Sequence, residues 1–198
     1  INKDGSKQTC FHNFPSLATE IIGLGLLKSF FPEKYPGKRR DYKYPIAVDA
    51  ILGACMMVRY DIIKQIGVMD EGYFFFLEET DWCFRMKNLG LKIYHIPDVN
   101  IVHLHGESTK KKVPVQTWIE YYRSNYRFFR KNRGVFSLAL IIFSKFIKLN
   151  INFILMFLVC AASCFSLKKY NQKLFTYGTL LFWHLKLCPK TMGLKNVK

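Results

Sequence analysis

Three carboxylates follow a run of aromatic residues in the middle of the chain. The run is Tyr-Phe-Phe-Phe at 73–76, and the acids are Glu78, Glu79 and Asp81. Apolar bulk disfavours the charged form of a nearby carboxyl group and raises its pKa. Such a group is suited to act as a general base, and Glu79 is the candidate. The alternative is that the three acids only decorate the first turn of a helix, where the helix dipole favours negative charge.

Hydrophobic periodicity and the positions of Gly and Pro predict the elements that must position these acids. A helix over 81–89 continues from the acidic cluster and ends at Gly90. Glu78 and Asp81 then share one face of the helix, and Glu79 points elsewhere. The other elements predicted for this half are a helix over 16–30, a loop over 31–45, a buried strand over 48–58, a helix over 60–66 stopped by Gly67, and strands over 91–96 and 99–104.

A histidine stands at the end of the last predicted strand, close to a cluster of positive charge. His103 lies three residues before Gly106, and lysines occupy 110–112. An isolated histidine in such a place is usually a core or rim residue, and the alternative is a ligand role. Together the histidine and the lysines predict a cationic opening beside the carboxylates, with an imidazole facing Glu79 across a cleft.

The charge of the chain is distributed unevenly. Residues 1–120 carry 16 Lys+Arg against 14 Asp+Glu, whereas residues 121–198 carry 14 Lys+Arg and no acid. A basic, half-apolar segment is suited to a polyanionic surface, either anionic lipid or nucleic acid. Residues 149–167 form a run of 19 residues without a charge. Nucleic-acid-binding segments do not normally carry such runs, so we expect an anionic membrane surface and no nucleic acid as the partner.

The basic half contains one amphipathic and three apolar segments. Residues 115–133 place Trp118, Tyr122 and Tyr126 at helical spacing, which predicts an amphipathic helix closed by Gly134. This helix packs on its own domain or lies at a bilayer interface, and the sequence leaves both open. The apolar segments, 135–144, 149–167 and 174–185, favour embedding in the plane of the membrane or as a hairpin over a pair of spanning helices.

Composition fits one domain with an appendage. The chain has 198 residues and is 50% hydrophobic, which is ample for a core. Its six cysteines include no C-x-x-C pair, so we expect reduced, intracellular thiols and no structural zinc site. There is no secretory signal, and position 1 is Ile, so we expect the chain to be the C-terminal part of something longer.

The order of motifs resembles the C-terminal half of inverting family 2 glycosyltransferases of the GT-A fold, most of all the rhamnosyltransferase-type members that build bacterial surface polysaccharides. The resemblance covers roughly residues 1–133. It rests on G-A-C-M-M-V-R at 53–59, I-G-V-M-D-E-G-Y-F-F-F-L-E-E-T-D-W-C-F-R at 66–85, G-L-K-I-Y-H-I-P at 90–97 and I-V-H-L-H-G-E-S at 101–108. It implies an α/β fold: part of a GT-A domain over 1–113, the amphipathic helix over 114–134, and basic, apolar membrane-associated helices over 135–198.

The resemblance also implies a role for each matching residue. Glu79 matches the catalytic base, which deprotonates the hydroxyl of a glycan or lipid-linked acceptor for attack on a nucleotide-sugar donor. His103 matches a ligand of a divalent metal, Mg or Mn, that neutralises the donor diphosphate. The remaining matches are Asp70, Glu71, Trp82 and Arg85 at the acceptor, and Gly53 and Ala54 at the donor.

The chain departs from the family pattern in two places. The family binds its nucleotide through an N-terminal region that ends in D-x-D, and this chain contains no D-x-D. We therefore expect most metal ligands outside it, and no activity from the chain alone. Glu79 replaces the commoner Asp. The sequence predicts part of a glycosyltransferase at the cytoplasmic face of the cell membrane, with a non-enzymatic membrane-surface protein or degenerate remnant as the alternative.

Overall fold

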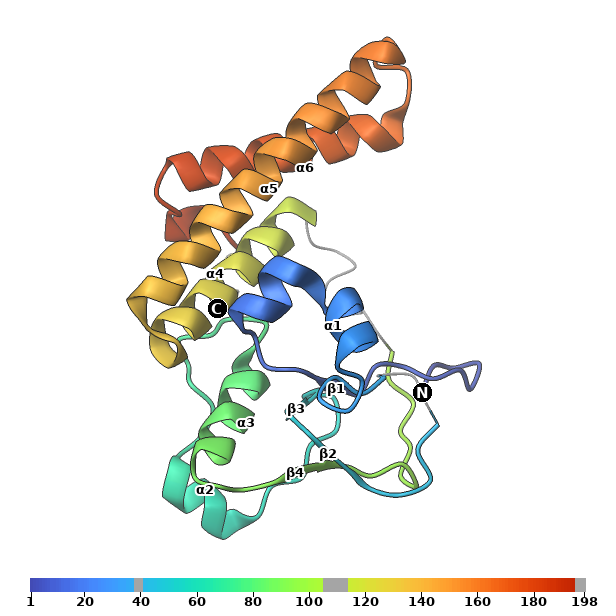
Figure 1. Ribbon diagram of the computed structural model, residues 1–198, viewed down its shortest axis with the longest axis vertical. Helices are drawn as coiled ribbons and strands as arrows, with labels where there is room; N and C mark the ends of the chain where they lie inside the picture. The colour runs from blue at the N-terminus through green and yellow to red at the C-terminus, as the bar shows by residue number, and fades with distance from the viewer. Residues whose placement is uncertain (38–40, 105–113, 195–198) are drawn as a thin grey trace. The chain divides into compact units, whose positions relative to one another are not determined.

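The computed structural model describes residues 1–37, 41–104 and 114–194. The chain divides into two compact units, residues 1–110 and 111–198. The first unit mixes short strands with helices, and the second is helical (Figure 1). The mixture of helices and sheet agrees with the α/β class expected for the first unit.

Four short strands of the first unit form two antiparallel pairs. β1 (Phe11–His12) pairs with β3 (Ala50–Ile51), with His12 opposite Ala50. β2 (Ile46–Val48) pairs with β4 (Ile93–His95), with Val48 opposite Ile93. The predicted strand over 91–96 is therefore confirmed in its central part.

One predicted strand is confirmed only at its start, and another is wrong. The segment 48–58 contains the last residue of β2, an interruption at Asp49 and β3, and it leaves the sheet after Ile51 for a turn at 53–55. The Asp49 carboxylate accepts hydrogen bonds from the amide of Phe14 and the amine of Lys87, both outside the strand. The segment 99–104 is not a strand. Among the described residues, its backbone makes two hydrogen bonds to the backbone of another segment: Ile101 accepts from the N-terminal amine of Ile1, and His103 donates to the carbonyl of Ile1. Two such bonds are too few for a strand ladder.

The helices of the first unit lie where periodicity places them. The stretch predicted over 16–30 contains η1 (Thr19–Gly23) and α1 (Leu24–Phe30), and the loop predicted over 31–45 holds no helix or strand in its described part; its basic residues 38–40 lie outside the described residues. α2 (Tyr60–Ile66) ends at Gly67, whose φ of 75° favours glycine. α3 (Glu78–Asn88) begins with the acidic cluster, as predicted.

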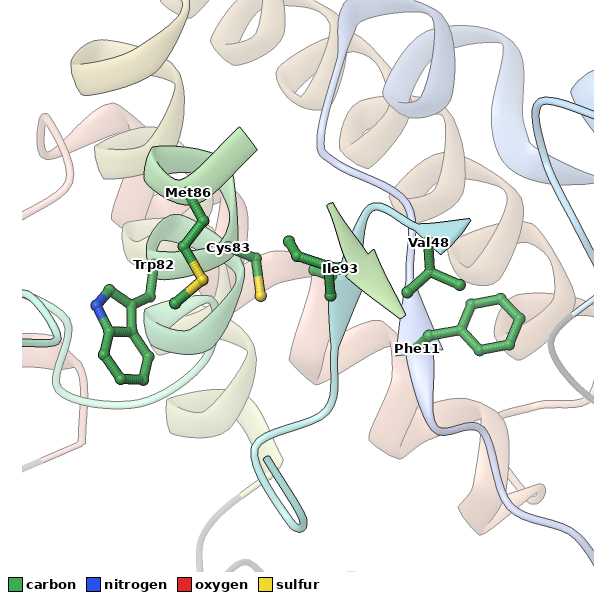
Figure 2. Packing of buried hydrophobic residues seen from close by; sticks show 7 residues of the cluster. Phe11, Val48, Trp82, Cys83, Met86 and Ile93 are labelled. Carbon is green, nitrogen blue, oxygen red and sulfur yellow. The ribbon is translucent and has the colours of Figure 1, made fainter. Parts of the chain in front are cut away.

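The core of the first unit lies between α3 and the strands. Trp82, Cys83 and Met86 contribute from successive turns of α3, at helical spacing. Figure 2 shows these side chains on one side of the cluster and Ile93, Val48 and Phe11, from the strands, on the other. Glu79, one turn before Cys83, lies on the same buried face of α3, so the packing that anchors the helix also fixes the position of the acid.

Three long helices form the second unit: α4 (Pro114–Asn132), α5 (Gly134–Ala162) and α6 (Lys168–Leu185), followed by the short η2 (Lys190–Met192) (Figure 1). α5 packs against both α4 and α6. Tyr126 on α4 stacks on Trp183 of α6 at an angle of 11°, and its hydroxyl lies 2.8 Å from Nε2 of His184. The helix predicted over 115–133 is confirmed.

The apolar segments of the second unit are more continuous than the sequence indicated. Residues 135–144 and much of 149–167 belong to one helix, α5, and Lys145 and Lys148 lie inside it rather than in a break. Helix formation tolerates lysine well, so two lysines among apolar residues do not end a helix. By length and composition, α5 is able to cross a membrane.

Candidate functional site

The acidic cluster occupies the first turn of α3, and the two residues before this turn have an unusual backbone conformation. Phe76 and Leu77, the two residues before the helix, both have positive φ, 69° and 64°. Two consecutive non-glycine residues in the left-handed region are uncommon and cost conformational free energy. Two further pairs, Cys164–Phe165 and Leu187–Cys188, share this geometry at the ends of α5 and α6, so the start of α3 is a candidate because the strain coincides with buried acids.

Glu79 is buried, and the pKa of its carboxyl group is raised to about 7. Burial is the largest cause and the negative charge of Glu78 the second, while the backbone amides of Glu79 and Thr80 act in the opposite direction and are included in this value. A carboxyl group with a pKa near the working pH is present in both protonation states. This is the property that a general base requires.

Two segments remote in sequence converge on Glu79. The Nε2 atom of His12, on β1, lies 3.9 Å from Oε1 of Glu79. A Cβ atom added to Gly53 would lie 3.7 Å from Cβ of Glu79 and 3.8 Å from its Cγ, so the turn at 53–55 runs alongside the acid. The structure thereby brings together the predicted base and one of the two predicted donor-binding residues. Ala54 is exposed in the same turn.

His12 is a site residue that sequence reasoning missed. It stands in a strand of two residues, with no motif around it, and its neighbour Phe11 is a core residue. Only the pairing of β1 with β3 brings it to α3, and that pairing has no local signal in the sequence.

Buried polar atoms flank Glu79 on its own helix. Oγ1 of Thr80 and Oε2 of Glu78 have no hydrogen-bond partner among the described residues. Folded proteins leave few buried polar atoms in this condition. Both atoms belong to residues adjacent in sequence to Glu79, so unpaired polar groups accompany the carboxyl group whose pKa is raised.

Asp81 has a structural role in the cluster. It is fully buried, and the hydroxyl of Tyr73 donates a hydrogen bond of 3.2 Å to its Oδ1. Arg85 donates from Nε to Oδ2 of Asp81 at 3.2 Å, and from its two terminal nitrogens to the carbonyls of Ile66 and Val68 at 2.6 and 2.7 Å. The planar guanidinium thus ties α3 to the loop after α2.

The other predicted acceptor residues lie in or beside that loop. Trp82 is buried in the core and donates from Nε1 to the carbonyl of Gly67 at 2.9 Å. Asp70 accepts from the backbone amide of Gly72 at 2.8 Å, which forms a local turn, and Glu71 is exposed. Trp82 and Arg85 hold the loop in shape, and contact of these four residues with an acceptor stays a prediction.

His103 is held by the N-terminal segment. Nε2 of Gln8 donates to the carbonyl of His103 at 2.7 Å, so Oε1 of Gln8 faces the ring and accepts from Nδ1 at 3.0 Å. This tautomer carries the lone pair on Nε2, the form in which a histidine ligates a metal. Within residues 1–37, 41–104 and 114–194, no three His, Cys, Asp or Glu residues cluster to hold an ion.

The imidazole of His12 lies close to Glu79, and the expected placement of His103 across a cleft from Glu79 stays a prediction. Glu79 and His103 share no hydrogen bond or ion pair in the part of the chain that the structure describes. The lysines at 110–112 and the end of the histidine motif, 105–108, lie outside the described residues. The cationic opening they were expected to form therefore stays a prediction.

Comparison with known proteins finds similarity to enzymes that transfer sugars. The chain is 28% identical to the dTDP-rhamnosyl transferase RfbF of Shigella flexneri, over 44% of this chain and 32% of the relative. It is 32% identical to the low-salt glycan biosynthesis hexosyltransferase Agl10 of Haloferax volcanii, over 43% of this chain and 25% of the relative. It is 29% identical to an N-acetylglucosaminyl-diphospho-decaprenol L-rhamnosyltransferase of Mycobacterium tuberculosis, over 38% of this chain and 24% of the relative.

Each match covers only part of this chain and only part of the relative. The chain covers less than a third of the length of each of these relatives. Neither a protein-family model nor a solved structure matches it. The three relatives are nonetheless glycosyltransferases of one kind or another, and their similarity supports a glycosyltransferase family for this chain.

Proposed function

We propose that the chain is the acceptor-side and catalytic part of an inverting, family 2-like glycosyltransferase of the GT-A fold. It moves a sugar from a nucleotide-sugar donor to a glycan or lipid-linked acceptor in the synthesis of a cell-surface polysaccharide, and rhamnose is the first donor sugar to test. The observation that carries the proposal is the buried Glu79, with its pKa raised to about 7, at the strained start of α3. The similarity to rhamnosyltransferases supports the choice of reaction.

In this mechanism Glu79 removes the proton from the attacking hydroxyl of the acceptor. The acceptor oxygen forms a bond to the anomeric carbon as the bond to the nucleoside diphosphate breaks, which inverts that carbon. The turn at Gly53 and Ala54 lies beside Glu79 and presents backbone to the donor sugar. Asp70 and Glu71, in the loop between α2 and α3, bind acceptor hydroxyls.

A divalent cation, Mg or Mn, fits this chain only in part. His103 supplies one ligand in the correct tautomer, and the described residues supply no cluster of three. The other ligands are then the donor diphosphate and residues beyond those described. Such an ion neutralises the diphosphate as it leaves.

The second unit attaches the enzyme to the cytoplasmic face of the cell membrane. α5 exposes apolar side chains along its length, among them those of Phe143, Ile147, Ile151, Ile154 and Leu158. Residues 121–198 carry only positive charge, which suits a leaflet rich in anionic lipid. The same exposed surface favours the second candidate, a membrane-binding protein without enzymatic activity.

An assay of sugar transfer tests the proposal. The protein used is the product of the whole genomic reading frame that contains this chain. The assay follows rhamnose from dTDP-rhamnose to an N-acetylglucosaminyl-diphospho-polyprenol in membranes. We expect Glu79→Gln to lower kcat by about 10²-fold or more while donor binding survives, because only the proton acceptor is lost.

Glu33→Gln, an exposed acid in the loop over 31–45, is the matched control and keeps wild-type rates. An unchanged kcat in Glu79→Gln would refute the assignment of the base. Membrane binding without transfer from any nucleotide sugar would favour the second candidate.

A further inference from the structure

We propose that His12 is a positioning residue that acts through Glu79: its imidazole passes on to solvent the proton that Glu79 takes from the acceptor. The inference rests on the proposed function, because it assigns a step to the base of that reaction. It is drawn from the placement of β1 against the start of α3.

Burial creates the need for such a residue. The Glu79 side chain is 10% exposed, and a bound acceptor would cover what remains. A base that is closed off in this way keeps the proton it has accepted unless a neighbouring group carries it away. The next turnover requires the carboxylate again, so release of this proton belongs to the catalytic cycle.

His12 meets this need in its position and in its exposure. Its Nε2 lies 3.9 Å from Oε1 of Glu79, about 1 Å beyond hydrogen-bond distance, which a small side-chain rotation covers. The His12 side chain is 30% exposed, three times as much as that of Glu79. Its imidazole therefore lies beside the buried acid and is itself partly exposed to solvent.

The fold holds the ring in this place. His12 stands opposite Ala50 in the pairing of β1 with β3, which fixes its place in the strand. Gly53 adds no side chain between the turn and the acid. Among the residues that the structure describes, the titratable groups found to interact with Glu79 are His12 from β1 and, on α3 itself, Glu78 and the thiol of Cys83.

The proton transfer balances without a further reactant. The neutral imidazole accepts the proton of the Glu79 carboxylic acid at Nε2, which leaves a carboxylate and an imidazolium. The imidazolium then loses a proton to water and returns to its neutral form. One proton leaves the acceptor hydroxyl and one proton reaches solvent in each turnover, and an imidazole has the pKa for both steps near neutral pH.

Imidazole rescue tests the relay in the transfer assay described above. We expect His12→Ala to lower kcat about tenfold with KM within about twofold of the wild type, because substrate binding does not use the ring. Free imidazole in the buffer restores the rate of His12→Ala and does not restore that of Glu79→Gln. A purely structural role of His12 predicts no rescue.

A titration of the 198-residue chain measures the pairing without any transfer. The pKa of His12, followed by NMR of the imidazole nitrogens, is lower in Glu79→Gln than in the wild type, because the nearby carboxylate that favours the imidazolium is gone. An unchanged His12 pKa in Glu79→Gln overturns the pairing. His12→Gln identifies the resonance without emptying the site.

The two proposals fail in different ways. Absence of transfer by the wild type overturns the proposed function and the relay with it. Transfer by the wild type, together with a His12→Ala variant that has the wild-type kcat and pH profile, overturns the relay alone. So does a loss of kcat that imidazole does not restore in a His12→Ala variant with the wild-type thermal unfolding curve.

Discussion

Gly53 lies against the side chain of Glu79, at a distance where one added methyl group makes ordinary contacts with the acid. A Cβ at this position would make ordinary van der Waals contacts of 3.7 and 3.8 Å with the acid. The turn at 53–55 and the start of α3 therefore form two walls of one site.

Substitutions at Gly53 test the width of that site. We expect Gly53→Ala to keep kcat/KM within about twofold, and Gly53→Leu to lower it about tenfold or more, because the branched side chain crowds Glu79. Steady-state kinetics of transfer measures both variants. Cys55→Leu, at an exposed position of the same turn, controls for added bulk away from the acid. Equal rates for Gly53→Leu and Gly53→Ala would count against the placement of the reaction here.

If Glu79 is the base, the charge of Glu78 should set the pH dependence of transfer. Its negative charge contributes to the raised pKa of Glu79, so Glu78→Gln lowers that pKa. A base must be deprotonated, and transfer therefore falls as the pH drops below about 7 in the wild type. We expect the acidic limb of the kcat profile to move to lower pH in Glu78→Gln. A limb that stays in place would show that another group limits the rate.

Glu79 also makes the stability of the fold depend on pH. Its pKa is about 7 when folded and 4.5 in its ordinary state, so between these values the folded chain binds more protons than the unfolded chain. Stability is then highest below pH 4.5 and falls as the pH rises to 7, by about 3 kcal/mol from this group.

Glu79→Gln removes this dependence, because the amide does not titrate. Thermal unfolding of the variant and the wild type at pH 5 and pH 8 measures it, and the variant gains relative stability at pH 8. Glu33→Gln serves again as the control. Parallel unfolding curves at both pH values would rule out a buried, proton-binding Glu79.

Arg85 stabilises the first unit through a buried ion pair and two carbonyls. Arg85→Met leaves the carboxylate of Asp81 buried without its cation, which we expect to lower the free energy of unfolding by about 3 kcal/mol. The double variant with Asp81→Asn recovers part of this loss, since the uncompensated charge is gone. Urea unfolding measures both.

The exposed ion pair of Arg59 with Asp61 is a matched control on the same unit. Arg59→Met should leave unfolding nearly unchanged, because solvent screens such pairs. If Arg59→Met lowers the free energy of unfolding as much as Arg85→Met does, burial does not explain the contribution of the Arg85–Asp81 ion pair.

α5 provides the test of membrane attachment. Ile151 and Ile154 are exposed apolar residues on this helix, and placing Asp at both disfavours insertion by roughly 3 kcal/mol each in a membrane centre. We expect the double variant to lose flotation with vesicles that contain anionic lipid. Gln172→Asp, on an exposed position of α6, controls for negative charge alone. Undiminished flotation of the double variant would contradict attachment through α5.

Local signals predicted those elements whose cause is local. The apolar spacing of 60–66 and the glycine at 67 placed α2 to the residue, and the acidic cluster marked the start of α3. In both cases neighbours in sequence are also neighbours in space. Glu79 is buried, as expected beside apolar residues, but His12 and Gly53, which lie beside it, come from distant segments.

The remainder depends on contacts between distant segments, which no window of sequence contains. Asp49 interrupts the predicted strand because it accepts hydrogen bonds from the amide of Phe14 and the amine of Lys87. Arg85 was expected at an acceptor, and its nitrogens bind carbonyls about twenty residues earlier. His12 reaches Glu79 only through the strand pair β1–β3.

The positive φ of Phe76 and Leu77 restricts which residue types fit at the two positions before α3. Leucine, isoleucine and valine have similar hydrophobicity, so hydrophobicity alone would allow any of them before the helix. At a left-handed position the second branch at Cβ collides with the backbone, and only unbranched residues, asparagine or glycine are accommodated. Leu77→Val and Leu77→Ile are therefore expected to shift the backbone at the start of α3, and with it Glu79, although they keep the hydrophobic character of the position.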